Sequence, residues 1–197
     1  MSNGQLILKS NFKILNKMKH NDQINYLRDS AFKLLKSSEF KEFAVILLAI
    51  ALEKQVKNVV IYNYRKSGLS AAFIRARLLK KMGYSELLHE LEWAASFPDN
   101  KKIKQIWKEA RTSINDVFGI MEIRNRIVHS NRHVSLSKIE TNVNVLLLVL
   151  EKLAEIFYLN FGYNGLETLP KTIKIDELMV GTKLFHRSIV VKVNKEK

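Results

Sequence analysis

Residues 43–52, Phe43-Ala44-Val45-Ile46-Leu47-Leu48-Ala49-Ile50-Ala51-Leu52, are the most apolar stretch of the chain, inside a segment, residues 40–64, that no Pro or Gly interrupts. The pattern predicts a long, largely buried helix that ends at the C-terminal signal of Ser67 and Gly68. Its apolar run is far shorter than the roughly 20 residues that a membrane span needs. We therefore expect a central helix of a soluble core and no membrane-spanning segment.

Helical periodicity continues on both sides of this central helix. Residues 21–36 carry apolar side chains at helical spacing, and Asn21-Asp22 can cap the N-terminus of such a helix. Ser70 can open a third helix that ends at Gly83, and Ser85-Glu86 can begin a short fourth that finishes before Pro98. These two predict a short helical hairpin inserted after the central helix.

The second half of the chain predicts two long helices and a loop between them. Asp99-Asn100 can cap a helix that reaches residue 129, and residues 130–136 then form the loop. Ser137 and Glu140 fit a capping box at the start of a further helix, which runs to about Phe161.

After Gly162 the pattern changes, because Thr172-Ile173-Lys174-Ile175 and Ile189-Val190-Val191-Lys192-Val193 favour strand. We expect an all-α fold: an antiparallel helical bundle over residues 1–163, with the inserted hairpin, followed by a small C-terminal extension over residues 164–197 that can be β.

Composition narrows the function. The formal net charge is +14, from 33 Lys and Arg against 19 Asp and Glu, and such an excess attracts polyanions, with nucleic acid as the first expectation. The chain has no cysteine, which excludes disulfides, Cys-ligated zinc and thiolate nucleophiles. Because the first residues also lack the pattern of a secretion signal, we expect a cytoplasmic protein.

One short motif points to chemistry. In Ile123-Arg124-Asn125-Arg126-Ile127-Val128-His129-Ser130, four residues separate Arg124 from His129, and a polar residue follows the arginine. This segment resembles the signature of the HEPN superfamily, in which four to six residues separate an arginine from a histidine. The position of the motif at the end of one long helix, before a loop and a second long helix, agrees with the order that the resemblance implies. The likeness covers approximately residues 22–161.

The residue types suit RNA cleavage without metal or cofactor. Attack by the ribose 2'-hydroxyl needs a base, an acid for the leaving oxygen, and cationic donors for the phosphorane. An imidazole such as that of His129 exchanges protons near neutral pH, and the guanidinium of Arg124 can hold a phosphate through two hydrogen bonds. Asn125 can orient the phosphate or His129. HEPN ribonucleases of the single-domain type complete the site by dimerising, so the resemblance implies a homodimer with RNA as its substrate.

Each motif residue also has a structural interpretation. Arg124 can pair with a carboxylate such as Glu122 or Asp116, Asn125 can bond at the helix end, and His129 can interact favourably with the helix dipole. His129 and His133 share a spacing that suits a metal site, but no carboxylate lies near them in the sequence, so no metal is expected.

Several basic residues are candidates for contacts with the RNA backbone. They are Arg126 beside the motif, Arg75, Arg77, Lys80 and Lys81 in one cluster, and Lys101, Lys102 and Lys104 in another.

The sequence therefore predicts a metal-independent endoribonuclease, a toxin or defence effector with an antitoxin or defence-system protein as a further partner. The alternative is a non-catalytic HEPN module that binds RNA, nucleotide or a partner protein. A weaker alternative is a DNA-binding regulator that uses residues 70–91 as a helix-turn-helix. Some HEPN toxins carry a modifiable tyrosine two residues after the histidine, and this chain has Asn131 there.

Overall fold

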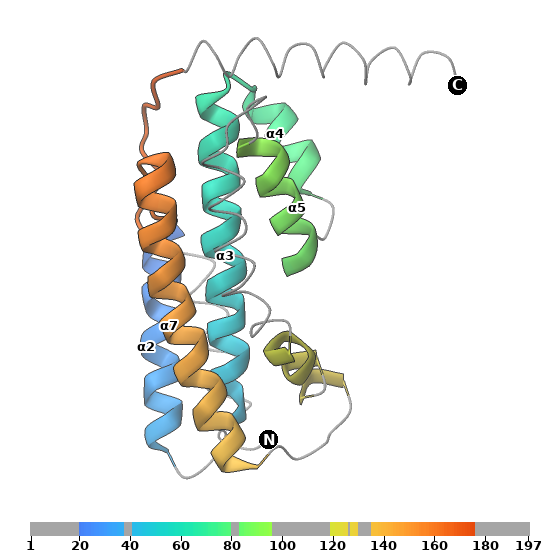
Figure 1. Ribbon diagram of the computed structural model, residues 1–197, viewed down its shortest axis with the longest axis vertical. Helices are drawn as coiled ribbons and strands as arrows, with labels where there is room; N and C mark the ends of the chain where they lie inside the picture. The colour runs from blue at the N-terminus through green and yellow to red at the C-terminus, as the bar shows by residue number, and fades with distance from the viewer. Residues whose placement is uncertain are drawn as a thin grey trace, which may run out of the picture.

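The computed structural model describes residues 20–37, 41–79, 83–95, 119–125, 127–129 and 135–175. Its centre is helix α3, Glu42–Lys66, which contacts α2 (His20–Lys36), α4 (Ala71–Leu78), α5 (Tyr84–Ala95) and α7 (Leu136–Phe161) (Figure 1). Fourteen of its 25 residues are buried, so α3 is enclosed by its neighbours, as the sequence predicted. The described residues are mainly helical and include no strand, which confirms the all-α class.

The end of α3 follows the predicted signal closely. Ser67 is the C-cap, and Gly68 takes the left-handed conformation with φ 72°. The amide of Gly68 donates to the carbonyl of Arg65, and that of Leu69 donates to the carbonyl of Tyr64, the two bonds of a Schellman motif. Leu69, the residue after this turn, is 8% exposed, so its side chain is again part of the core.

Helices α2 and α3 are antiparallel, whereas α3 and α7 run in the same direction. The Nζ atom of Lys54 in mid-α3 donates to Oε1 of Gln23, near the start of α2, over 2.9 Å. Lys41, just before α3, lies 3.5 Å from Glu140 in the first turns of α7. At the opposite end the rings of Tyr62 and Tyr163 stack with centroids 4.9 Å apart.

Two buried side-chain amides connect α3 to α7 and to the coil that follows it. Nε2 of Gln55 donates to the carbonyls of Leu150 and Asn164 at 3.0 and 3.2 Å, and Nδ2 of Asn58 donates to that of Gly165 at 2.9 Å. Gly165 has φ +79°, and a Cβ atom there would lie 2.6 Å from the carbonyl oxygen of Gln55. Only glycine fits this close approach, which packs the beginning of the predicted C-terminal extension against α3.

Helices α4 and α5 correspond to the predicted hairpin and lie on the same side of α3 (Figure 1). The hydroxyl of Ser70 accepts the Phe73 amide and caps α4 as predicted. Nε of Arg77 donates to Oε1 of Glu90 over 2.7 Å, and the guanidinium lies 5.2 Å from the ring centroid of Trp93. These contacts connect the two short helices.

Several predicted boundaries are wrong. The N-cap of α7 is Ser135, not Ser137, because the backbone is still extended at Ser135 with φ −61° and ψ 143°. Ser137 lies inside the first turn, where its carbonyl accepts a bond from Thr141, and Glu140 contacts Lys41 instead of closing a capping box.

The other helix boundaries differ less from those predicted, and one predicted strand is not formed. Helix α4 ends at Leu78, short of Gly83; α5 begins one residue before Ser85; and α2 already includes Asn21 and Asp22. Residues 172–175 are coil, not strand, because no neighbouring strand among the described residues offers backbone partners. The second predicted strand, residues 189–193, lies outside the described part of the chain.

Within the described residues, none of the helices combines the length and the apolar character that crossing a bilayer requires.

Candidate active site around Arg124

The motif lies on a helical segment, residues 119–125 and 127–129, that packs beside the first half of α3 (Figure 1). Ile120 and Met121 are 4% and 8% exposed, and Ile127 packs against the same core. These apolar residues fix one face of the segment to the bundle. The remaining positions of the motif are thereby held at the boundary between the core and the solvent.

Arg124 reaches from this boundary toward α3. Its Nη1 atom lies 3.8 Å from Oε1 of Glu53, an ion pair too long for a direct hydrogen bond, and 3.2 Å from Oδ1 of Asn125, to which it donates. The Arg124 side chain is 30% exposed. Its Nε is buried and has no hydrogen-bond partner among the described residues. The guanidinium therefore has unused donor capacity while its position is fixed by two oxygens.

Glu53 is the functional candidate that sequence reasoning missed. The side chain is 22% exposed in the middle of α3, and burial raises the pKa of its carboxyl, with the Arg124 guanidinium opposing that shift. Tyr84, at the start of α5, is 4% exposed, and its pKa is raised by burial and by the Glu53 carboxylate. The only signal in the sequence is the position of Glu53, a carboxylate directly after the apolar run of residues 43–52.

Asn125 and His129 are both exposed. They are four residues apart on the segment, so they share a face about one turn apart. The structure thus brings Arg124 and Asn125 into contact and leaves the His129 imidazole open to solvent. The carboxylate that forms an ion pair with Arg124 is Glu53. The sequence had offered Glu122 and Asp116 as examples of such a partner.

The residues predicted to contact RNA divide into three groups. Arg77 pairs with Glu90 and lies over the ring of Trp93, so its charge is compensated within the fold, and its predicted contact with RNA stays a prediction. Arg75 is exposed and has no counter-ion among the described residues. Lys80, Lys81, Lys101, Lys102, Lys104 and Arg126 lie outside the residues whose side chains the structure describes.

Metal binding has no support where the structure can be inspected. No group of three or more His, Asp or Glu side chains in the described segments is arranged to hold an ion. His133, the second member of the histidine pair considered from the sequence, is outside those segments.

Comparison of the chain with protein-family models, with curated proteins and with solved structures found no match in any of the three. The HEPN assignment therefore stays a prediction from the motif and its position.

Proposed function

We propose that the chain is a metal-independent endoribonuclease of the HEPN type, acting as a toxin or defence effector at a composite site formed by two copies. The observation that supports this most is the arrangement of the motif itself. Arg124 is braced by Glu53 and Asn125, and His129 stands exposed on the same short segment. A cation held in position and an accessible imidazole are the two groups that in-line attack of a 2'-hydroxyl on its own phosphate requires.

In the proposed reaction, His129 takes the proton of the ribose 2'-hydroxyl, and the freed oxygen forms a bond to the adjacent phosphorus. Arg124 donates hydrogen bonds to the phosphorane oxygens as their negative charge grows. The bond from phosphorus to the 5'-oxygen then breaks, and that oxygen takes a proton from the His129 of the second copy. The products are a 2',3'-cyclic phosphate and a 5'-hydroxyl end.

The decisive experiment is cleavage of mixed RNA by purified protein in EDTA, with mass spectrometry of the new ends. Removing a general acid or base lowers a rate by about 10²- to 10⁴-fold, so His129→Ala should fall by that amount, and Arg124→Ala comparably. His89→Ala is the matched control, because His89 is an exposed histidine on α5 and not part of the motif segment.

Cleavage that survives in His129→Ala or Arg124→Ala would refute the site. Loss of cleavage in EDTA with recovery on adding a divalent metal would refute the acid–base role of His129, and would direct attention to His129 and His133 as ligands.

A second candidate, a non-catalytic HEPN module, is favoured by one observation. The ion pair between Arg124 and Glu53 attaches the motif helix to α3, and this structural role is enough to explain it without any catalytic role for Arg124. Such a module would bind RNA without cutting it, and Arg124→Ala would then chiefly lower stability. The cleavage assay separates the two candidates, because only the enzyme yields cyclic phosphate ends.

A further inference from the structure

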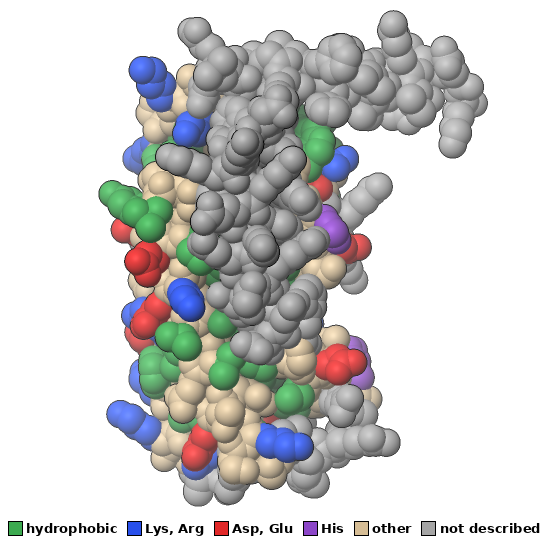
Figure 2. All heavy atoms as spheres, viewed as in Figure 1, with side chains coloured by type: hydrophobic (Ala, Val, Ile, Leu, Met, Phe, Trp, Pro, Cys, Tyr) green, Lys and Arg blue, Asp and Glu red, His purple; other side chains and the backbone are tan. Residues whose placement is uncertain are grey.

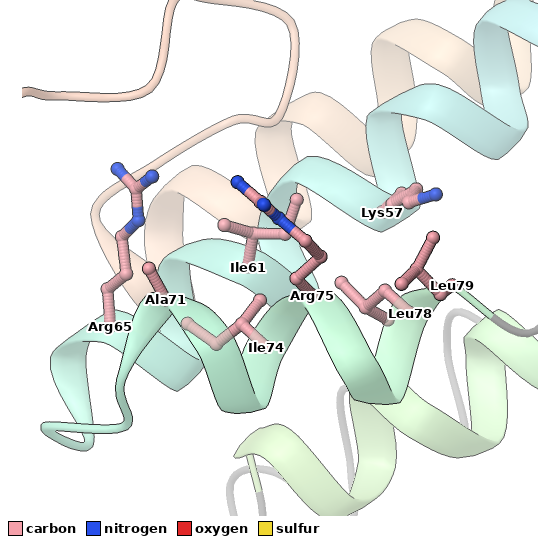
Figure 3. Close-up of a pocket in the computed structure, with 8 residues that line it drawn as sticks. All are labelled: Lys57, Ile61, Arg65, Ala71, Ile74, Arg75, Leu78 and Leu79. Atoms are coloured by element: carbon pink, nitrogen blue, oxygen red, sulfur yellow. The ribbon is translucent and has the colours of Figure 1, made fainter.

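A hollow of about 300 Å³ lies between the second half of α3 and helix α4. Figure 3 shows its lining: Lys57, Ile61 and Arg65 from α3, and Ala71, Ile74, Arg75 and Leu78 from α4, with Leu79 just after that helix. None of the described motif residues lines it. It is therefore a feature separate from the candidate active site.

The charge in this hollow is of one sign. Lys57, Arg65 and Arg75 are the charged residues among the described residues that line it, and these include no carboxylate. None of the three has an ion pair with a described residue, whereas Arg77, two positions after Arg75, is neutralised by Glu90. Lys57 also repels a neighbouring cation on α3: the pKa of Lys54 is lowered by burial and by the charge of Lys57.

Helix dipoles explain only part of this arrangement. Arg65 and Arg75 lie in the last turns of α3 and α4, where a cation is favourable. That effect does not require the two arginines to share a hollow with Lys57 from the middle of α3. Three like charges gathered around one concave surface create a local field that favours a bound anion.

The floor of the hollow is aliphatic. Ile74 and Leu78 are 6% and 7% exposed, while Leu79 at the rim is 71% exposed. No aromatic ring is among the described residues that line the hollow, so these residues offer bases no stacking platform. A ligand must therefore be recognised through its negative charges, with its less polar parts resting on Ile74 and Leu78. A phosphodiester backbone with its sugars fits this description and needs no particular sequence.

We propose that this hollow is an exosite for the RNA backbone, holding phosphates through Lys57, Arg65 and Arg75. The proposed ribonuclease function enters only in naming RNA as the anion. Lys57 is one turn after Glu53 on α3, and Ile61 is eight residues after it, or about 12 Å along the helix axis. An RNA strand cut beside Arg124 is long enough to reach the exosite within a few nucleotides.

The test measures binding apart from cleavage. A fluorescent, mixed-sequence 2'-O-methyl oligoribonucleotide lacks the attacking hydroxyl, so its affinity can be measured by anisotropy over a series of salt concentrations. The variant Lys57→Gln, Arg65→Gln, Arg75→Gln is compared with Lys33→Gln, Lys152→Gln, Lys171→Gln, which removes the same charge from exposed positions on α2, on α7 and in the coil. Circular dichroism and thermal melting check that both variants fold. If the triple exosite variant does not fold, the single variant Arg75→Gln replaces it.

The exosite variant should weaken binding by about tenfold or more, and should lower the slope of log K against log salt by about 2, since each phosphate contact on a single strand contributes about 0.7. The control should change affinity less than about threefold. Equal losses in the two variants, or no RNA binding by the unaltered chain, would overturn the proposal. A labelled oligoglutamate peptide is tested in the same way. If it binds as tightly as the RNA, and only the exosite variant loses this binding, the proposal is also overturned, because the hollow would then be a site for an acidic peptide. None of these outcomes depends on whether the protein cleaves RNA.

Discussion

At the scale of single residues, Glu53 is the position where stability and the proposed activity conflict. A carboxylate that is 22% exposed in the middle of an apolar helix is held at an energetic disadvantage, and Arg124 offsets only part of it. Natural proteins keep such a residue where it orients another group. We therefore interpret Glu53 as a positioning residue for Arg124.

We predict that Glu53→Gln separates these two roles. The glutamine resembles the protonated carboxyl, so the free energy of unfolding at neutral pH should stay the same or rise. RNA cleavage should fall by about tenfold to a hundredfold, because Arg124 loses the charge that fixes its position. The control is Glu140→Gln, which removes an exposed carboxylate from a 3.5 Å ion pair with Lys41 and should change neither quantity. Lower stability with undiminished cleavage would show that Glu53 is only structural.

The same residue predicts a pH dependence of stability. Because burial raises the pKa of Glu53, the folded protein keeps this proton to a higher pH than the unfolded chain does. Between the ordinary glutamate pKa and the raised value, the contribution of Glu53 to the free energy of unfolding therefore falls as pH rises. Denaturant titrations should show that Glu53→Gln gains stability relative to the unaltered chain through this window, and a constant difference would contradict the assignment.

At the scale of elements, α4 shows how two arginines on one short helix take different roles. Arg77 faces α5, where Glu90 is 6% exposed and needs a partner for its charge. Arg75 faces the hollow against α3 and has no described counter-ion. The first arginine holds the hairpin together, and the second belongs to the proposed exosite.

We predict that Arg77→Ala lowers the free energy of unfolding by about 1–2 kcal/mol, because it leaves the buried Glu90 carboxylate without its cation. Arg75→Ala, the matched control on the same helix, should change stability by less than about 0.5 kcal/mol. Chemical denaturation monitored by circular dichroism measures both. Equal stability of the two variants would mean that the contact between Arg77 and Glu90 contributes nothing to the hairpin.

At the scale of the whole molecule, one chain supplies one motif, and the proposed chemistry needs an acid and a base. Val128 in the motif and Leu148 on α7 are large apolar side chains that are 51% and 61% exposed, and burying them between two copies would remove apolar surface from water. Figure 2 shows hydrophobic side chains between charged ones on the surface formed by α2 and α7. These positions are where we expect two copies to meet.

We predict that Val128→Asp and Leu148→Asp each weaken self-association by about tenfold or more, since a charge would have to be buried in the interface. RNA cleavage should fall in parallel at concentrations where the dimer dissociates. Ile175→Asp, at a side chain that is 52% exposed in the coil after α7, is the control and should leave association unchanged. Sedimentation velocity measures the effect, and full cleavage by a protein that is monomeric throughout would refute the composite site.

The sequence by itself determined the features that depend on neighbouring residues. The apolar run at residues 43–52, Gly68 at the end of α3 and Ser70 at the start of α4 predicted the central helix and its exit correctly, because periodicity, left-handed φ and N-capping act within a few residues. The motif around Arg124 was also visible locally, since it is a spacing along one segment.

Only the tertiary structure decided which distant groups meet. The ion pair between Glu53 and Arg124 could not be predicted from the sequence, and neither could the different surroundings of Arg75 and Arg77. The partner of a charged side chain depends on which helices pack together. The capping box at Ser137 was wrong because α7 already begins after Ser135, and the Glu140 carboxylate contacts Lys41 on another segment instead of the amides of its own helix. Electrostatic contacts act through space with little regard to separation along the chain, so local patterns fix the helices while packing decides what their charges do.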